Sequence, residues 1–136
     1  MAALTATATA WAPRVLSLLR IVAGLLFLQH GTIKYFDFPA GSGMHNPEMP
    51  VLSMFGIGGI LEIVGSLLLI LGLFTRPVAF ILSGMMAVAY WTFHAPGSFY
   101  PVLNQGEAAI LFCFVFLYLA CAGGGVWSVD AKRGQA

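Results

Sequence analysis

Three stretches of this chain are long, apolar and almost free of charge. Residues 51–75 contain one charged side chain, Glu62, and residues 108–129 contain none. Residues 15–33 contain Arg20 and His30 in an otherwise apolar run. A membrane-spanning helix needs about 20 apolar residues, with roughly 17 to 25 tolerated. These three stretches therefore predict membrane helices.

A fourth apolar stretch, residues 78–93, is shorter and also has no charged side chain. Pro77 precedes it and suits the first turn of a helix, where a missing N–H leaves no bond unmade. The connections between the four stretches are rich in Gly and Pro, which favour turns and loops. The pattern predicts an all-α fold, an integral membrane four-helix bundle.

The composition supports lipid as the main solvent. Hydrophobic residues make up 60% of the chain and charged residues 8%, whereas soluble domains carry about 25% charged residues. So few charges could not cover a surface that faces water. The net charge is +1, without a basic run, so the sequence predicts lipid contact and no nucleic-acid partner.

The chain divides into a short tail, one domain and a second tail. We expect an N-terminal tail at 1–13, the four-helix domain at 14–130 and a C-terminal tail at 131–136. The N-terminal residues lack a basic region before the apolar core, so they do not resemble a signal peptide. The first apolar segment is therefore expected to stay in the mature protein.

Orientation follows from the distribution of Lys and Arg. In a four-span arrangement Arg14, Arg76, Lys132 and Arg133 lie on one side, and Lys34 lies near the other. Cytoplasmic loops carry an excess of Lys and Arg. This predicts a multi-pass protein with both termini in the cytoplasm.

Five ionisable side chains are predicted to gather in the outer half of the bundle. In this arrangement the ends of the first and third helices meet the start of the fourth, and Glu62 of the second helix lies beneath them, close to mid-membrane. The predicted ligand-binding residues are His30, Lys34, Glu62, His94 and Glu107. Imidazole exchanges protons near neutral pH, so this set suits hydrogen bonding to the carbonyl oxygens of a quinone and delivery of protons. The sequence identifies no catalytic residue and no metal site.

The same residues also have a purely structural interpretation. An ionisable group facing lipid at a helix centre costs about 2.5–3.5 kcal/mol, so Arg20 or Lys34 is expected to pair with Glu62 or Glu107. We expect a structural ion pair between Arg20 and Glu62. Under this interpretation the polar cluster fixes helix packing and binds nothing.

Two further sets of residues have a predicted packing role. Gly58, Gly65 and Gly72 recur every seven residues, and small residues in lipid let helices approach closely. Cys113 and Cys121 would be separated by roughly 12 Å along one helix. A disulfide needs Cα atoms within about 7 Å, so the two cysteines are predicted to be packing residues.

Several motifs in order resemble the DoxX family of small bacterial membrane proteins. They are an Arg in the first helix, "HGTIKYF", "GGILEIVGSLLLILGLFTRP", "FHAPGSFYP" and "NQGEAAILF". The resemblance implies a four-helix bundle in the bacterial inner membrane and a relation to a thiosulfate–quinone oxidoreductase. Some family members associate with redox proteins. The positions that match are Arg20, His30, Gly31, Lys34, Glu62, Gly72, His94, Gly106 and Glu107.

Three functions stay open at this point. The first is a quinone-linked oxidoreductase subunit, which would need a redox partner protein because the sequence contains no redox cysteine pair, dinucleotide loop or haem-attachment motif. The second is a non-enzymatic partner or assembly factor of a redox complex. The third is a small-solute transporter, for which assembly into a homo-oligomer would provide room. His30 and His94 as axial ligands of one haem are a further alternative.

Overall fold

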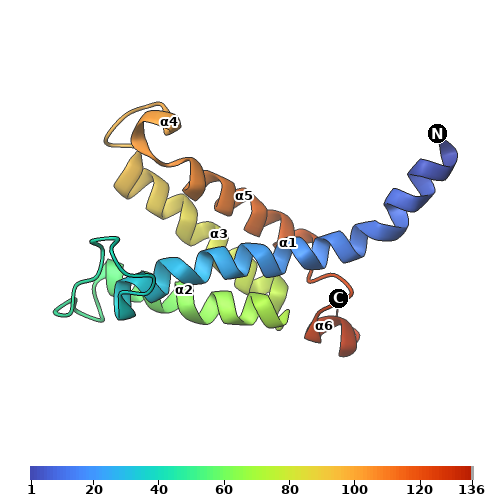
Figure 1. Cartoon of the computed structure of the whole chain (residues 1–136), viewed down its shortest axis with the longest axis horizontal. Helices are drawn as coiled ribbons and strands as arrows, with labels where there is room; N and C mark the ends of the chain where they lie inside the picture. The colour runs from blue at the N-terminus through green and yellow to red at the C-terminus, as the bar shows by residue number, and fades with distance from the viewer. Residues whose placement is uncertain (136) are drawn as a thin grey trace.

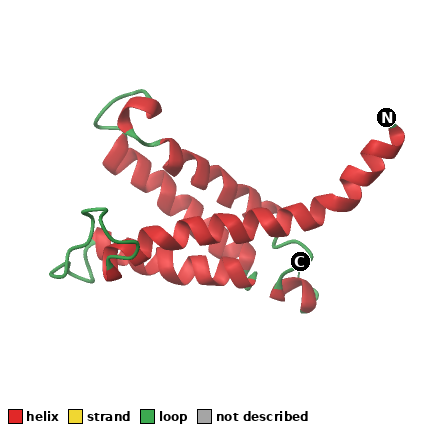
Figure 2. Ribbon diagram, viewed as in Figure 1, coloured by secondary structure: helices red, strands yellow, loops and turns green. Residues whose placement is uncertain are grey.

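The structure, a computed structural model, describes residues 1–135 and consists there of helices and loops (Figure 2). No strand occurs among these residues, so the predicted all-α class is confirmed. The elements in chain order are α1 (Ala2–Phe36), α2 (Met54–Leu71), α3 (Thr75–Ala89), the π-helix η1 (Tyr90–His94), α4 (Pro101–Asn104), α5 (Glu107–Ala122) and α6 (Val129–Lys132).

Three helical segments are long and apolar enough to cross a membrane. They are Leu4–Phe36, Met54–Leu71 and Thr75–His94, the last of which joins α3 to η1. Helix α5 is apolar but has only 16 residues. It is shorter than the predicted helix at 108–129, because Gly123 and Gly125 adopt positive φ angles of 87° and 72° and turn the chain.

The helices form two side-by-side pairs, α1 with α2 and α3 with α5 (Figure 1). The pairs converge at the end that holds the turn at 72–74 and the segment 123–135, which we name the tail end. They diverge at the end that holds the connections 37–53 and 95–106, which we name the loop end. Helix α1 bends away from the bundle toward its N-terminus (Figure 1), and Pro13 lies inside it. Proline removes a helical hydrogen bond and commonly kinks a helix.

Glycines of α1 set the close contact between α1 and α2. A Cβ atom at Gly31 would lie 2.8 Å from the carbonyl oxygen of Gly59, and one at Gly24 would lie 3.2 Å from that of Ser66. The glycines predicted to pack at seven-residue spacing, Gly58, Gly65 and Gly72, do not all lie at a helix contact. Gly65 packs against Leu82 of α3, whereas a Cβ at Gly58 would have only the Lys34 ammonium within reach, at 4.0 Å.

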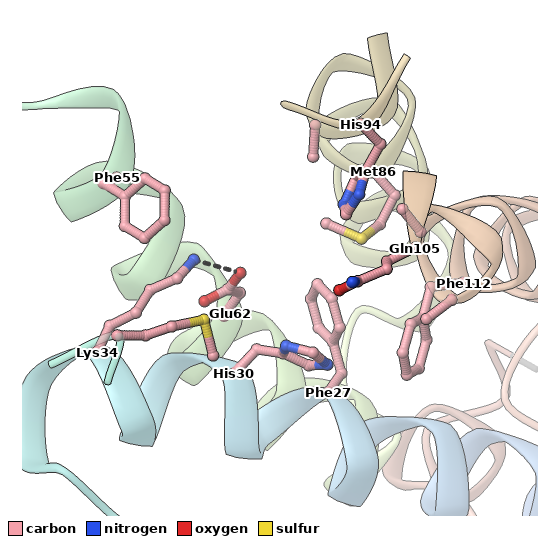
Figure 3. A pocket seen from close by; sticks show the side chains of 13 residues that line it. Phe27, His30, Lys34, Phe55, Glu62, Met86, His94, Gln105 and Phe112 are labelled. Atoms are coloured by element: carbon pink, nitrogen blue, oxygen red, sulfur yellow. Dashed lines mark hydrogen bonds and ion pairs between the residues drawn. The ribbon is translucent and has the colours of Figure 1, made fainter. Parts of the chain in front are cut away.

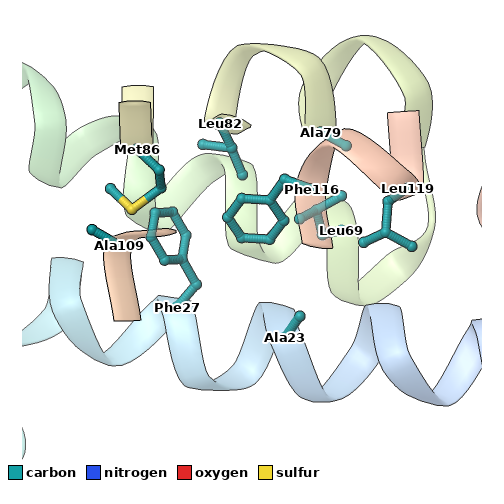
Figure 4. Close-up of a cluster of buried hydrophobic side chains, with 9 residues drawn as sticks. All are labelled: Ala23, Phe27, Leu69, Ala79, Leu82, Met86, Ala109, Phe116 and Leu119. Carbon is teal, nitrogen blue, oxygen red and sulfur yellow. The ribbon is translucent and has the colours of Figure 1, made fainter. Parts of the chain in front are cut away.

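The apolar core lies where the two helix pairs meet, and all four long helices contribute to it (Figure 4). Phe27 of α1 is almost fully buried against two rings of α5. Its ring centroid lies 5.1 Å from that of Phe112 and 4.9 Å from that of Phe116. These are favourable separations for aromatic pairs, so the aromatic cluster joins α1 to α5 across the bundle.

Arg20 closes the tail end of the bundle. Its side chain is fully buried, and its Nε donates to the carbonyl oxygen of Gly124 at 2.8 Å. Its Nη1 donates to the carbonyls of Leu69 and Ile70, at the C-terminus of α2. Its Nη2 donates to the carbonyl of Trp127 at 2.6 Å. One guanidinium therefore links α1, the end of α2 and the chain that follows α5.

Asp130 secures the same end from the C-terminal segment. Its carboxylate accepts hydrogen bonds from the backbone N–H groups of Phe74 and Thr75, at 2.9 and 2.8 Å, and so caps the start of α3. Burial alone would raise the pKa of Asp130, but hydrogen bonds from Thr75 and Phe74 and the charge of Arg133 outweigh burial and hold the pKa below its usual value. The backbone N–H of Asp130 also donates to the carbonyl of Gly72 at 2.9 Å.

We predict that Arg20→Ala destabilises the protein far more than Arg14→Ala. Hydrogen bonds to a charged group contribute about 1.5–3 kcal/mol each, and the substitution removes several of them from a buried site. Arg14 is exposed and bonds within its own helix, so it is the matched control. The measurement is the thermal unfolding midpoint in one detergent, and equal shifts for the two variants would contradict the assignment.

We also predict that Asp130 contributes stability that depends on pH. Because its pKa is lowered by folding, the contribution is present above the unfolded value of 3.8 and is lost as pH falls through the lower folded pKa. Asp130→Asn should reduce stability near neutral pH and flatten the acid part of the stability profile. Unfolding midpoints are measured from neutral to acid pH, and an Asp130→Asn profile parallel to that of wild type would contradict the assignment.

Candidate functional site

A cavity of about 240 Å³ lies between the two helix pairs toward the loop end (Figure 3). Its walls are mostly aromatic and aliphatic, and α1, α2, α3 with η1, and α5 all contribute to them. Five polar residues line it, namely His30, Lys34, Glu62, His94 and Gln105. The structure thus brings four of the five predicted ligand-binding residues to one cavity.

Lys34 and Glu62 form an ion pair across the α1–α2 contact. The Lys34 Nζ lies 2.7 Å from Glu62 Oε1, and the two side chains are only 12% and 6% exposed. The Lys34 ammonium also lies 4.6 Å from the ring centroid of Phe55, within the range of a cation–π interaction. The pair therefore neutralises two buried charges at the wall of the cavity.

The predicted ion pair between Arg20 and Glu62 is wrong, because the cation beside Glu62 is Lys34. Fourteen residues of α1 separate Arg20 from Lys34, about 21 Å along a helix. Arg20 is therefore level with the far end of α2, where it meets the carbonyls of Leu69 and Ile70. Pairing of Lys34 with Glu62 was the alternative that the sequence left open.

The second oxygen of the Glu62 carboxylate has no hydrogen-bond partner within residues 1–135, although it is buried. Leaving a buried polar atom without a partner costs about 1–3 kcal/mol, and more when the group is charged. Glu62 lines the cavity, so a donor group on a bound molecule could satisfy this oxygen. Ligand pockets are mostly apolar with a few placed polar groups, and this oxygen is one such polar group in the wall of the cavity.

His30 and His94 reach the cavity from opposite helix pairs (Figure 3). The His30 ring stands perpendicular to the ring of Phe112, with centroids 6.0 Å apart, and makes no hydrogen bond with the described part of the chain. His94 Nδ1 lies 3.0 Å from the carbonyl oxygen of Asn104. Because a carbonyl oxygen only accepts, this contact places a proton on Nδ1 and leaves Nε2 available to a ligand.

His94 is held at the cavity by the π-helical turn η1. The backbone N–H of Ala95 donates to the carbonyl of Tyr90 at 2.9 Å, five residues earlier, and the His94 ring stacks on that of Tyr90. π-Helical turns rotate the following side chains relative to an α-helix and are frequent at functional sites. The sequence pattern of the third helix gave no sign of this change.

The fifth predicted residue, Glu107, does not line the cavity, and Gln105 does. Glu107 is the exposed first residue of α5. Gln105 lies two residues earlier in a left-handed conformation with φ of 58°. The two residues stand on either side of Gly106, the N-cap of α5, so Gln105 precedes the helix and Glu107 is part of it. The expectation that Glu107 joins the pocket is therefore corrected.

No group of three His, Cys, Asp or Glu side chains in residues 1–135 lies close enough together to hold a metal ion. Cys113 and Cys121 are both free thiols. The Ser83 hydroxyl donates to the carbonyl of Cys113 at 2.8 Å and ties α3 to α5. The polar side chains that line the cavity can supply hydrogen bonds, charge and proton exchange.

The apolar helices, their glycine-mediated contact and the polar cavity between them define a helical membrane protein with a buried polar site. A family model described as DoxX matches residues 15–95, which include four of the five polar cavity residues. The chain therefore belongs to the DoxX family. It is also 44% identical over 127 residues to an uncharacterized protein of Haemophilus influenzae, with 88% of this chain and 91% of that protein covered. No solved structure matches.

We predict that Lys34 and Glu62 are energetically coupled. Removing one partner of a buried ion pair leaves an uncompensated charge and costs about 3–5 kcal/mol, whereas neutralising both partners leaves no unpaired charge. Lys34→Met should therefore lower the unfolding midpoint strongly, and Glu62→Gln in the same chain should restore most of it. The measurement is a double-mutant cycle of unfolding free energies. Additive effects of the two substitutions would show that the pair is not formed.

Proposed function

We propose that the cavity binds the head group of a membrane quinone and that the protein is a quinone-linked oxidoreductase subunit. The observation that carries this proposal is the meeting of imidazole and ammonium groups with one unpaired carboxylate oxygen in an apolar cavity. His30 and Lys34 can donate, the free Oε2 of Glu62 accepts, and Nε2 of His94 accepts in the neutral ring and donates in the imidazolium. They come from both helix pairs, so a small polar molecule between the pairs could contact all of them.

The walls fit a flat ring with two carbonyl groups. Phe27, Met86 and Phe112 supply apolar faces. Imidazole or ammonium donors suit the carbonyl oxygens of a quinone, which only accept, and the unpaired Glu62 oxygen suits a hydroxyl of the quinol, which donates. The volume of about 240 Å³ lies just below the roughly 300–1,000 Å³ of pockets for drug-sized ligands. This size favours a single substituted ring over a larger head group.

The residues of this chain would bind the ring and move protons. Reduction of a quinone to a quinol takes two electrons and two protons. His94 holds a proton on Nδ1 through Asn104, so its Nε2 can exchange a proton with a ligand. Glu62 and Lys34 form a paired acid and base at the opposite wall. The electrons would come from a redox protein that associates with this subunit.

We further propose four membrane spans, with both termini in the cytoplasm of a bacterial cell and the cavity in the outer half of its inner membrane. Helix α5, with 16 residues, is about 24 Å long. A hydrocarbon core is about 30 Å thick, and local thinning of the bilayer accommodates such a mismatch. Arg76, Lys132 and Arg133 lie at the tail end, in agreement with the positive-inside rule.

We predict that a tailless benzoquinone binds the purified protein and that His30→Ala with His94→Ala weakens binding about tenfold or more. Tenfold corresponds to about 1.4 kcal/mol, the contribution of one to two hydrogen bonds. The measurement is equilibrium binding by calorimetry or tryptophan quenching. Glu107→Gln is the control, because Glu107 is exposed and outside the cavity. Equal affinities for the double variant and wild type would remove this cavity as the quinone site.

A further inference from the structure

A second hollow opens beside the cavity, between α1 and α5, with a volume of about 300 Å³. Helix α1 lines it with Leu19, Val22, Ala23 and Leu26, which share one helix face at i, i+3, i+4 and i+7. Helix α5 lines it with an apolar face of the same spacing between positions 108 and 115. Every lining side chain is apolar, so the hollow offers no hydrogen bond to an occupant. We name it the α1–α5 groove.

The groove adjoins the polar cavity. Phe112 and Ala108 line both. A third hollow, lined by Leu26, His30 and Phe112 among others, lies where the groove and the cavity meet. Phe112 is thus the common wall of all three, and its ring contacts that of His30. A molecule with its polar end at His30 would leave the cavity past Phe112 into the groove.

We propose that the α1–α5 groove binds the hydrocarbon tail of the molecule whose head group occupies the polar cavity, and that this molecule enters sideways from the bilayer. The proposal rests on the proposed function, because it takes a lipid-soluble ligand as the occupant of the cavity. A prenyl or alkyl chain matches the wholly apolar lining. It would run along α1 for the seven residues from Leu26 to Leu19, about 10 Å of helix.

The size of the groove argues against a helix of a second copy or of a partner protein. A helix with its side chains is about 10 Å in diameter, so a length of about 10 Å fills roughly 800 Å³. The groove has a volume of about 300 Å³. A single flexible chain fits this space, whereas a helix could only rest on its rim.

The preference of the groove for a ligand tail over a lipid chain must come from its connection to the cavity. Lipid tails are as apolar as Leu, so exchange of one chain for another in the groove carries little hydrophobic driving force. Any bilayer chain could enter it. The tail of a ligand is favoured because the head group, held by polar contacts in the cavity, places the tail at the entrance of the groove.

The test is photolabelling in lipid nanodiscs with a benzoquinone whose alkyl tail ends in a diazirine. Labelled peptides are mapped by mass spectrometry in the full-length protein, with and without excess tailless benzoquinone. Val22→Phe narrows the groove from α1, and Val115→Phe narrows it from α5. Val64→Phe is the matched control, because Val64 of α2 is 50% exposed and Val22 is 51% exposed, while Val64 lines neither hollow.

We expect labels in residues 19–26 and 111–115, displaced by the tailless compound and reduced about tenfold by either groove variant but not by the control. Labels spread evenly over the lipid-facing helices, or unaffected by both groove variants, would overturn the groove as the site of the tail. If excess tailless benzoquinone still lowered the labelling in that case, the proposed function would keep its support. Groove labels that the tailless compound cannot displace would refute the quinone site and reduce the groove to a site for bilayer lipid.

Discussion

The structure depends on one constraint, which is that polar groups in hydrocarbon must find their partners inside the protein. At the tail end the buried guanidinium of Arg20 meets this constraint. Every nitrogen of the Arg20 guanidinium donates to a main-chain carbonyl, and those carbonyls include Leu69 and Ile70 at the C-terminus of α2. The loop end meets it only in part, since the Glu62 carboxylate has one paired and one unpaired oxygen.

This difference between the two ends explains where a ligand site can exist. Arg20 and Asp130 fasten the C-terminal segment to α1, α2 and the start of α3, so the helix pairs are joined at the tail end. Gly72 permits the close approach, because a Cβ there would lie 2.4 Å from that of Ser128. From this closed end the pairs diverge (Figure 1), and the space between them holds the cavity and the groove.

The sequence predicted the helical class and the meeting of His30, Lys34, Glu62 and His94, because apolar length and depth along each helix are local properties. It failed where distant segments decide the outcome. Arg20 donates to the carbonyls of Gly124 and Trp127, in the segment that follows α5 and packs against the tail end of the bundle. The periodicity of apolar residues does not predict where this segment packs. Gln105 lines the cavity and Glu107 does not, since Gln105 adopts a left-handed conformation just before the Gly106 cap of α5, and no apolar periodicity predicts that turn.

The central claim is that the polar cavity is a ligand site and not only a set of packing contacts. The most direct measurement is an experimental structure of the protein in nanodiscs, saturated with a benzoquinone that carries a heavy-atom substituent. Our account predicts the heavy-atom signal between His30, Glu62 and His94, with Lys34 still beside Glu62. A signal elsewhere, or a cavity collapsed by direct contact of these side chains with one another, would contradict it.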